Sequence, residues 1–302
     1  MNLKQLHDRF CRLKLTEELS KSTIQAYQCH FRSFLSISGA TTIDEVSLEV
    51  IEDWIFTGTT ERKWRPKTTR NALICMSAFL DWCVDHEYIS QNFAKKIKKP
   101  KLKKPETPKS LTLEQTQLLI QCARRYRYAY DHERHRAVAI VTMFLYAGLR
   151  LQELLGLKLE DVDFSRSVIF VEHGKGDKSR LIPLDPRLKA YLQPYLAERE
   201  SINPYSEYFF VPLRGLGKLN QITIRRLMQK WSKKLGFHLH PHMLRHTFAT
   251  LVLKGCMRNL GRDKGIYGLS KILGHENIKT TEIYAKHDVE DLVPIIENHL
   301  LG

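Results

Sequence analysis

The sequence lacks long hydrophobic runs, paired cysteines and a nucleotide-binding loop. Its longest uncharged run, Ala137 to Leu149, has 13 residues, whereas a membrane-spanning helix needs about 20. The six cysteines include no CxxC pair, so we expect neither a disulfide framework nor a cysteine-rich zinc site. The opening residues MNLKQLHDRF lack the apolar segment of a signal peptide, and no GxxxxGKS or GxxxxGKT loop is present to bind ATP. We expect a cytoplasmic protein with reduced thiols and no membrane association.

The charge of the chain points to a polyanionic partner. Lysine and arginine number 48 against 33 aspartate and glutamate residues, which gives a formal net charge of +15 and an isoelectric point near 9.5. Such an excess favours nucleic acid, because cationic side chains release the counterions condensed on phosphates. The length of 302 residues and the hydrophobic content of 43% predict two domains, each with its own core.

A segment rich in lysine and proline divides the chain. Residues 94–110 read AKKIKKPKLKKPETPKS, in which the prolines oppose a continuous helix and the like charges extend the backbone. We expect a linker over residues 95–109 between an N-terminal domain, 1–94, and a second domain, 110–302. The linker is a solvated tether, a contact to DNA phosphates, or both, and the lysines concerned are Lys95, Lys96, Lys98, Lys99, Lys101, Lys103 and Lys104.

The N-terminal domain is predicted to be helical. Ser20 or Ser22 can cap a helix whose apolar residues recur on one face. A second helix is expected to begin at Pro66, because proline suits the first turn. Between them, a short helix is expected to end at a turn around Gly58. A plain helical bundle with no function of its own would show the same pattern.

The second domain is predicted to mix helices with a small sheet. Thr112 and Gln115 fit a capping box, and residues 136–147 form an almost wholly apolar helix that should be buried. Two short β-branched runs around a glycine-rich tip indicate a β-hairpin, 168–171 with 181–184. Further helices are expected at 222–235 and 243–254. The fold class is therefore mainly α with a small β-sheet.

Several separated residues could perform chemistry, although each alone has an ordinary structural explanation. Arg150 could pair with Glu153 on a helix surface, and Lys175 lies between two glycines, where turn lysines are common. Tyr284 could simply anchor the last helix, and Tyr267 and Tyr205 are tyrosines of the same type. The sequence pattern alone leaves these alternatives open.

The histidines around residue 240 favour phosphate chemistry over metal binding. His242 and Arg245 share one helical face, where a guanidinium can hold two phosphate oxygens while an imidazole moves a proton. A zinc site from His238, His240, His242 and His246 is the alternative, but no carboxylate is interleaved as in HExxH. We expect no metal and no other cofactor, and His240, His246 and His287 are interpreted as local supports or solvated residues.

Taken together, these segments resemble the tyrosine recombinase (phage integrase) family, most of all its Xer-type and integrase members. AGLRLQELLGLKLEDVD resembles the first-arginine block, GKGDKSRLIPL the β-hairpin lysine block, and HPHMLRHTFAT the His-x-x-Arg block; ILGHENIKTTEIYAKHD resembles the segment with the last histidine and the tyrosine. The resemblance covers nearly the whole chain. It implies a helical, SAM-like N-terminal core-binding domain and a mixed α+β catalytic domain, which together form a C-shaped DNA clamp.

The resemblance also implies the nucleophile and the phosphate ligands. Tyr284 would attack a DNA phosphodiester, leaving a 3′-phosphotyrosine and a free 5′-hydroxyl group. Arg150 and Arg245 would hold the non-bridging oxygens. Glu153 and Asp161 are candidates for orienting Arg150.

The resemblance implies two proton transfers and one hydrogen bond from three further residues. Lys175 would protonate the departing 5′-oxygen, and His242 would accept the tyrosine proton. His275 would hydrogen-bond the phosphate. No metal and no ATP would be required, because one phosphoester is exchanged for another.

The implied partner is double-stranded DNA that carries a specific recombination site. A dimer would bind each site, and a tetramer would assemble on two sites. Accessory DNA-bending proteins are a further class of partner. Arg225 and Arg226 are expected to add DNA contacts. Residues 255–270 look longer than in the family and are interpreted as a loop insertion or as an extra DNA or subunit contact. The tail after Tyr284 would dock on its own domain or on a neighbouring subunit.

The function implied is site-specific recombination, in Xer-like resolution or in the integration and excision of a mobile element. Two alternatives share the fold. One is a catalytically silent, site-specific DNA-binding regulator, and the other is a relaxing enzyme of the type IB topoisomerase kind.

Overall fold

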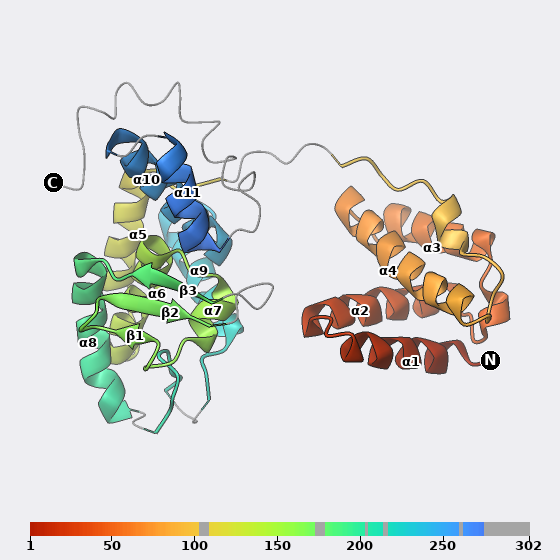
Figure 1. Ribbon diagram of the computed structural model, residues 1–302, viewed down its shortest axis with the longest axis horizontal. Helices are drawn as coiled ribbons and strands as arrows, with labels where there is room; N and C mark the ends of the chain where they lie inside the picture. Colours follow the sequence, from red (N-terminus) through yellow and green to blue (C-terminus); the bar gives the residue numbers. More distant parts are fainter. Residues whose placement is uncertain (103–108, 173–178, 203–204, 214–216, 260–261, 275–302) are drawn as a thin grey trace. The chain divides into compact units, whose positions relative to one another are not determined.

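The computed structural model describes residues 1–102, 109–172, 179–202, 205–213, 217–259 and 262–274, with side chains throughout these ranges except over 256–265. The chain divides into two compact units, Met1–Pro105 and Glu106–Gly302 (Figure 1). The division falls inside the segment 95–109 that we expected to be a linker.

The first unit is built from helices around an aromatic core. Its helices are α1 (Leu3–Thr16), α2 (Lys21–Ser38), α3 (Leu48–Thr60) and α4 (Pro66–Asp85), with the 3-10 turns η1 (Ile43–Glu45) and η2 (Phe93–Lys96). The Ser20 hydroxyl caps α2 by accepting from the Thr23 N–H at 3.2 Å, and Pro66 is the first residue of α4. Both predicted helix starts are confirmed.

Two expectations for this unit were wrong in detail. The helix α3 does not end at Gly58 but continues to Thr60, because the glycine leaves room for the Trp64 ring, which a Cβ atom there would overlap. Lys95 and Lys96 belong to η2, which contacts α4. Lys95 also forms a 2.6 Å ion pair with Asp81, so the start of the lysine-rich segment is part of the first unit.

The second unit contains seven helices and three strands in its described residues. They are α5 (Leu113–Arg125), α6 (Asp131–Ala147), α7 (Leu151–Gly156), β1 (Val162–Asp163), β2 (Val168–Val171), β3 (Arg180–Pro183), α8 (Pro186–Ile202), α9 (Gln221–Leu235), α10 (Pro241–Asn259) and α11 (Arg262–Leu273). The three strands form one antiparallel sheet in the order β1-β2-β3, with Phe170 opposite Leu181. The mainly α fold with a small sheet, the hairpin and the Thr112 capping box are confirmed.

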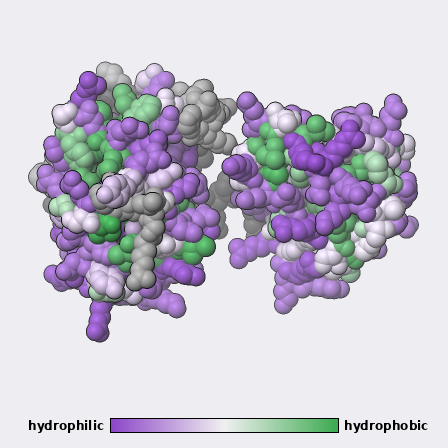
Figure 2. Space-filling view, turned by 90° about the horizontal axis from the view of Figure 1, so that it is seen from below, coloured by the Kyte–Doolittle hydropathy of each residue, from purple (hydrophilic) through white to green (hydrophobic). Residues whose placement is uncertain are grey.

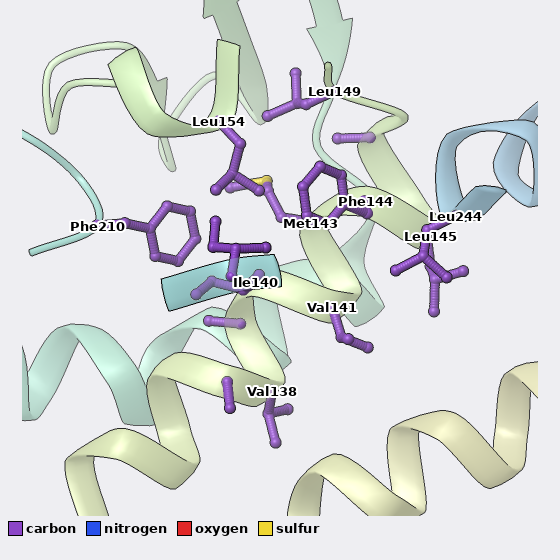
Figure 3. Packing of buried hydrophobic residues seen from close by; sticks show 14 of the residues in the cluster. Val138, Ile140, Val141, Met143, Phe144, Leu145, Leu149, Leu154, Phe210 and Leu244 are labelled. Atoms are coloured by element: carbon purple, nitrogen blue, oxygen red, sulfur yellow. The ribbon is translucent and has the colours of Figure 1, made fainter. Parts of the chain in front are cut away.

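The helix α6 is the centre of this unit. Its residues 136–145 are all buried, and it packs against α5, α8 and α10. Figure 3 shows Ile140, Met143 and Phe144 of this helix beside Leu154 of α7 and Phe210. The helix begins at Asp131, five residues before the predicted start, because polar residues form its first turn.

The expectation of a loop over residues 255–270 was wrong. Residues up to Asn259 continue α10, and α11 begins at Arg262. The two helices pack against each other, with Phe248, Leu253, Leu269 and Leu273 in a small separate core. The segment therefore adds helix to the second unit.

The face shown in Figure 2 is mostly hydrophilic, with apolar side chains in smaller groups among the hydrophilic ones. Among the residues that the structure describes, no helix combines the length and apolar character needed to cross a membrane. Cys11, Cys29, Cys75, Cys83 and Cys122 are free thiols.

Gly148, which ends α6, should tolerate no side chain. It has φ +62°, and a Cβ atom there would overlap the Phe248 ring. We expect Gly148→Ala to lose about 1 kcal/mol from backbone strain and a further ~1–3 kcal/mol from overpacking. Gly236→Ala is the matched control, since Gly236 has φ +76° with nothing within 4 Å. Thermal unfolding of the two full-length variants should differ, and equal melting temperatures would contradict the packing argument.

Candidate active site

Two helix starts in the second unit carry three of the predicted catalytic residues. After α6, Gly148 turns the chain, and Arg150 occupies the residue before α7. The Arg150 N–H donates to Glu153 Oε2 at 2.7 Å, which caps the first turn of α7. The backbone at Arg150 and its side chain are thus fixed by the same carboxylate, because Arg150 Nη1 donates to Glu153 Oε1 at 2.7 Å.

The helix α10 presents His242 and Arg245 at its beginning. Pro241 is its first residue, and His240 Nδ1 accepts from the Met243 N–H at 3.1 Å, which satisfies one donor of the first turn. The His242 and His246 rings lie 4.1 Å apart in an edge-to-face arrangement. His240 therefore supports the helix start, as expected, and the His246 ring packs against that of His242.

An open cleft of about 620 Å³ brings these residues together. Arg150, His242 and Arg245 all line it, although the chain separates the first from the others by more than ninety residues. Its other polar walls come from Gln152 and from one face of α9, and the full polar lining is Arg150, Gln152, Gln221, Arg225, Gln229, His238, His240, His242 and Arg245. The cleft is thus rich in cationic and imidazole groups.

The Glu153 carboxylate lies among three guanidinium groups. Besides Arg150, Arg180 donates from both Nη atoms to the two carboxylate oxygens at 2.9 and 2.7 Å, and Arg245 Nη1 is 3.7 Å from Oε2. The carboxylate is only 5% exposed, so water does little to screen these charges. Three positive charges and one negative charge leave a net charge of +2 in this cluster around Glu153.

The same three arginines hold the C-terminal end of α11. Arg180 Nε donates to the carbonyl oxygen of Ile272 at 2.7 Å, Arg245 Nη2 to that of Leu273 at 2.6 Å, and Arg150 Nη2 to that of Gly274 at 3.3 Å. The last carbonyls of a helix have no intrahelical partners and carry partial negative charge. The guanidinium groups therefore supply both the hydrogen bonds and the positive charge that this helix end lacks.

The surroundings of Glu153 and His242 lower the pKa of both side chains. Burial raises the pKa of Glu153, but its hydrogen bonds to Arg180 and Arg150 and the charge of Arg180 lower it to about 2, so the group is ionised. Burial, followed by the charges of Arg245, His240 and Arg150, lowers the pKa of His242 below 6.5. The lowered pKa favours the neutral form of His242, which can accept a proton.

Other predicted residues lie elsewhere or outside the described residues. Asp161 does not contact Arg150; its carboxylate accepts from the Lys158 N–H at 2.7 Å instead. Arg226 is exposed on α9 and, unlike Arg225, does not line the cleft. Tyr267 is exposed on α11, and neither it nor Tyr205 lines the cleft. The residues outside the described ranges are Lys103, Lys104, Lys175, His275, Tyr284, His287 and the tail that follows.

Arg180 was not predicted from the sequence. A signal was present, because side chains alternate along a strand and Arg180 has the same parity as the buried Ile182. An arginine on the inward face of a strand requires a carboxylate or carbonyl partner.

Among the described residues, no cluster of three or more histidine, cysteine, aspartate or glutamate side chains could hold a metal ion.

Comparisons with known proteins agree with these features. The sequence profile of the phage integrase family matches residues 109–291. Tyrosine recombinase XerC of Actinobacillus pleuropneumoniae is 31% identical over 94% of this chain and 90% of that protein. Tyrosine recombinase XerA of Pyrococcus horikoshii is 37% identical over 68% of this chain and 65% of that protein.

A solved structure supports the fold. The XerH site-specific recombinase, bound to its palindromic difH substrate after cleavage, superposes with a TM-score of 0.72 at 20% identity, over 96% of this chain and 83% of that chain. The profile match covers more than half of the chain. The chain therefore belongs to the phage integrase family and is an enzyme of the tyrosine recombinase type.

Proposed function

We propose that this enzyme cuts and rejoins DNA at a specific site through a 3′-phosphotyrosine on Tyr284, without metal or ATP. The observation that carries the proposal is the convergence of Arg150, His242 and Arg245 on one cleft. Two guanidinium groups and a neutral imidazole match the needs of a phosphodiester under attack. A binding protein without catalysis has no need for a neutral imidazole beside two arginines.

In the proposed reaction the Tyr284 oxygen attacks the phosphorus, the P–O5′ bond breaks, and a P–O bond to tyrosine forms. His242 takes the phenol proton, and Lys175 gives a proton to the 5′-oxygen. Arg150 and Arg245 hold the non-bridging oxygens, with a hydrogen bond from His275. Reversal with the 5′-hydroxyl group of another strand rejoins the DNA and returns both protons. Covalent catalysis divides one difficult step into two easier ones.

Site recognition is proposed to involve the face of α9 that lines the same cleft. Gln221, Arg225 and Gln229 recur every four residues and so lie on one side of the helix. Arginine and glutamine can contact phosphates or pair with base edges in the major groove. The lysines of 95–109 and Arg226 are proposed to add backbone contacts. A dimer per site and a tetramer on two sites would complete the recombination complex, in Xer-like resolution or in movement of a mobile element.

Covalent capture tests the nucleophile and also recovers the DNA site. A pool of nicked duplexes with a randomised segment is incubated with the full chain in EDTA, denatured, and searched for protein-linked DNA. We expect a 3′-linked adduct with the wild type and none with Tyr284→Phe. Tyr267→Phe, a matched change at an exposed position on α11, should keep the adduct.

The other outcomes identify the alternatives. An adduct with Tyr284→Phe would assign the nucleophile to another residue. Binding of one sequence without any adduct would favour a silent regulator, and relaxation of plasmids that lack the captured sequence would favour a topoisomerase-like enzyme. Loss of the adduct in EDTA would contradict metal independence.

The lowered pKa of His242 predicts the pH dependence of cleavage. A base must be deprotonated, and the folded pKa lies below 6.5. The acid decline in the rate of adduct formation should therefore lie at a lower pH than a histidine with its ordinary pKa would produce. His242→Gln should slow the reaction by about 10²–10⁴-fold and remove this acid decline. A variant that keeps the decline would place the base elsewhere.

Arg225, which lines the cleft, should contribute more to DNA affinity than Lys233, an exposed residue of α9 outside the cleft lining. With the captured duplex as probe, Arg225→Gln should weaken binding and reduce the slope of log affinity against log salt by about one, if the contact is to a phosphate. Lys233→Gln, which removes the same charge from the same helix at an exposed position outside the cleft lining, is the matched control. Equal effects in fluorescence anisotropy would contradict this placement of the DNA.

A further inference from the structure

Arg180 belongs to the site without reaching into the cleft. It begins β3, its side chain is 8% exposed, and it makes a two-point fork with Glu153. Neither Arg180 nor Glu153 is among the residues that line the cleft. The groups that Arg180 contacts are Glu153 and the end of α11.

The charges around Glu153 show what Arg180 contributes. With Arg180 present, three guanidinium groups surround one carboxylate and the net charge is +2. Without it, the carboxylate would face Arg150 at 2.7 Å and Arg245 at 3.7 Å and would cancel one of them. The Glu153 side chain is 5% exposed, so water would do little to replace the missing partner.

We propose that Arg180 is a positioning residue that neutralises Glu153, so that Arg150 and Arg245 keep their positive charge for the scissile phosphate. The inference rests on the proposed function, in which those two arginines bind a DNA phosphodiester. Arg180 thereby maintains the positive charge that Arg150 and Arg245 present to the cleft, although Arg180 does not line the cleft. Glu153 can hold Arg150 in position without reducing the attraction for the phosphate.

The geometry at the end of α11 supports this assignment. Arg180 Nε holds the Ile272 carbonyl, and the next two carbonyls receive Arg245 and Arg150. A Cβ atom on Gly274, which has φ +62°, would come within 3.3 Å of Arg180 Cδ. Arg180 is thus packed between Glu153 and the helix end, where its planar group contacts both at once.

A purely structural salt bridge predicts a different result. Loss of a buried ion-pair partner would then lower stability, and the cleavage defect would be independent of the charge of the substrate. A charge-balancing role predicts two further effects. Removal of the Glu153 charge should restore activity, and a substrate without charge at the scissile phosphate should be insensitive to Arg180.

The test uses the full chain and the nicked duplex recovered by covalent capture, with either a phosphate or a neutral methylphosphonate at the scissile position. Arg180→Met should slow adduct formation on the phosphate by about 10²-fold. The double variant Arg180→Met, Glu153→Gln should form the adduct about tenfold faster than Arg180→Met alone. Glutamine keeps an acceptor oxygen without the charge. On the methylphosphonate, wild type and Arg180→Met should react within about tenfold of each other.

Arg187→Met is the matched control, because Arg187 makes a similar fork with Asp185 nearby on the surface; it should leave both rates unchanged. If Arg180→Met does not fold, Arg180→Gln provides the same comparison, since it removes the charge and keeps an N–H donor for the Ile272 carbonyl. Equal losses on the two substrates, or no recovery in the double variant, would overturn the inference. Absence of an adduct with the wild type would instead overturn the proposed function.

Discussion

The arrangement of the second unit depends on the buried, ionised carboxylate of Glu153. A carboxylate removed from water is costly unless cations and donors surround it. Here the compensating groups come from α7, β3 and α10, which are far apart in the sequence. The carboxylate therefore fixes the relative positions of these three elements, and with them the residues that line the cleft.

The end of α11 is held by the same network. Three successive carbonyl groups would lack partners at this helix end, and each receives one of the three guanidinium groups. The position of α11 is thus coupled to the charge balance around Glu153. The network also holds Gly274, the residue that precedes the predicted His275 in the sequence. Fold stability and site geometry are consequences of one set of bonds.

Local signals in the sequence predicted much of the fold, and the failures have a physical reason. The Ser20 cap, the Pro66 start and the Thr112 box depend on nearby residues, so they can be recognised from the sequence. A turn was expected at Gly58 and a loop insertion was one interpretation of 255–270, yet both regions are largely helical. At Gly58 the reason is the Trp64 ring, a packing partner that no local pattern identifies. Arg180 was missed because Glu153 lies 27 residues earlier.

The requirement for arginine at all three positions follows from the shape of the network. Each guanidinium contacts Glu153 and also donates to one of three successive main-chain oxygens. A planar group with donors on several edges can do this, whereas the ammonium group of lysine is a single point of charge. Arg180 uses both Nη atoms on the carboxylate and Nε on Ile272, which a lysine could not span. The geometry therefore selects arginine at position 180 even though that side chain never meets the cleft.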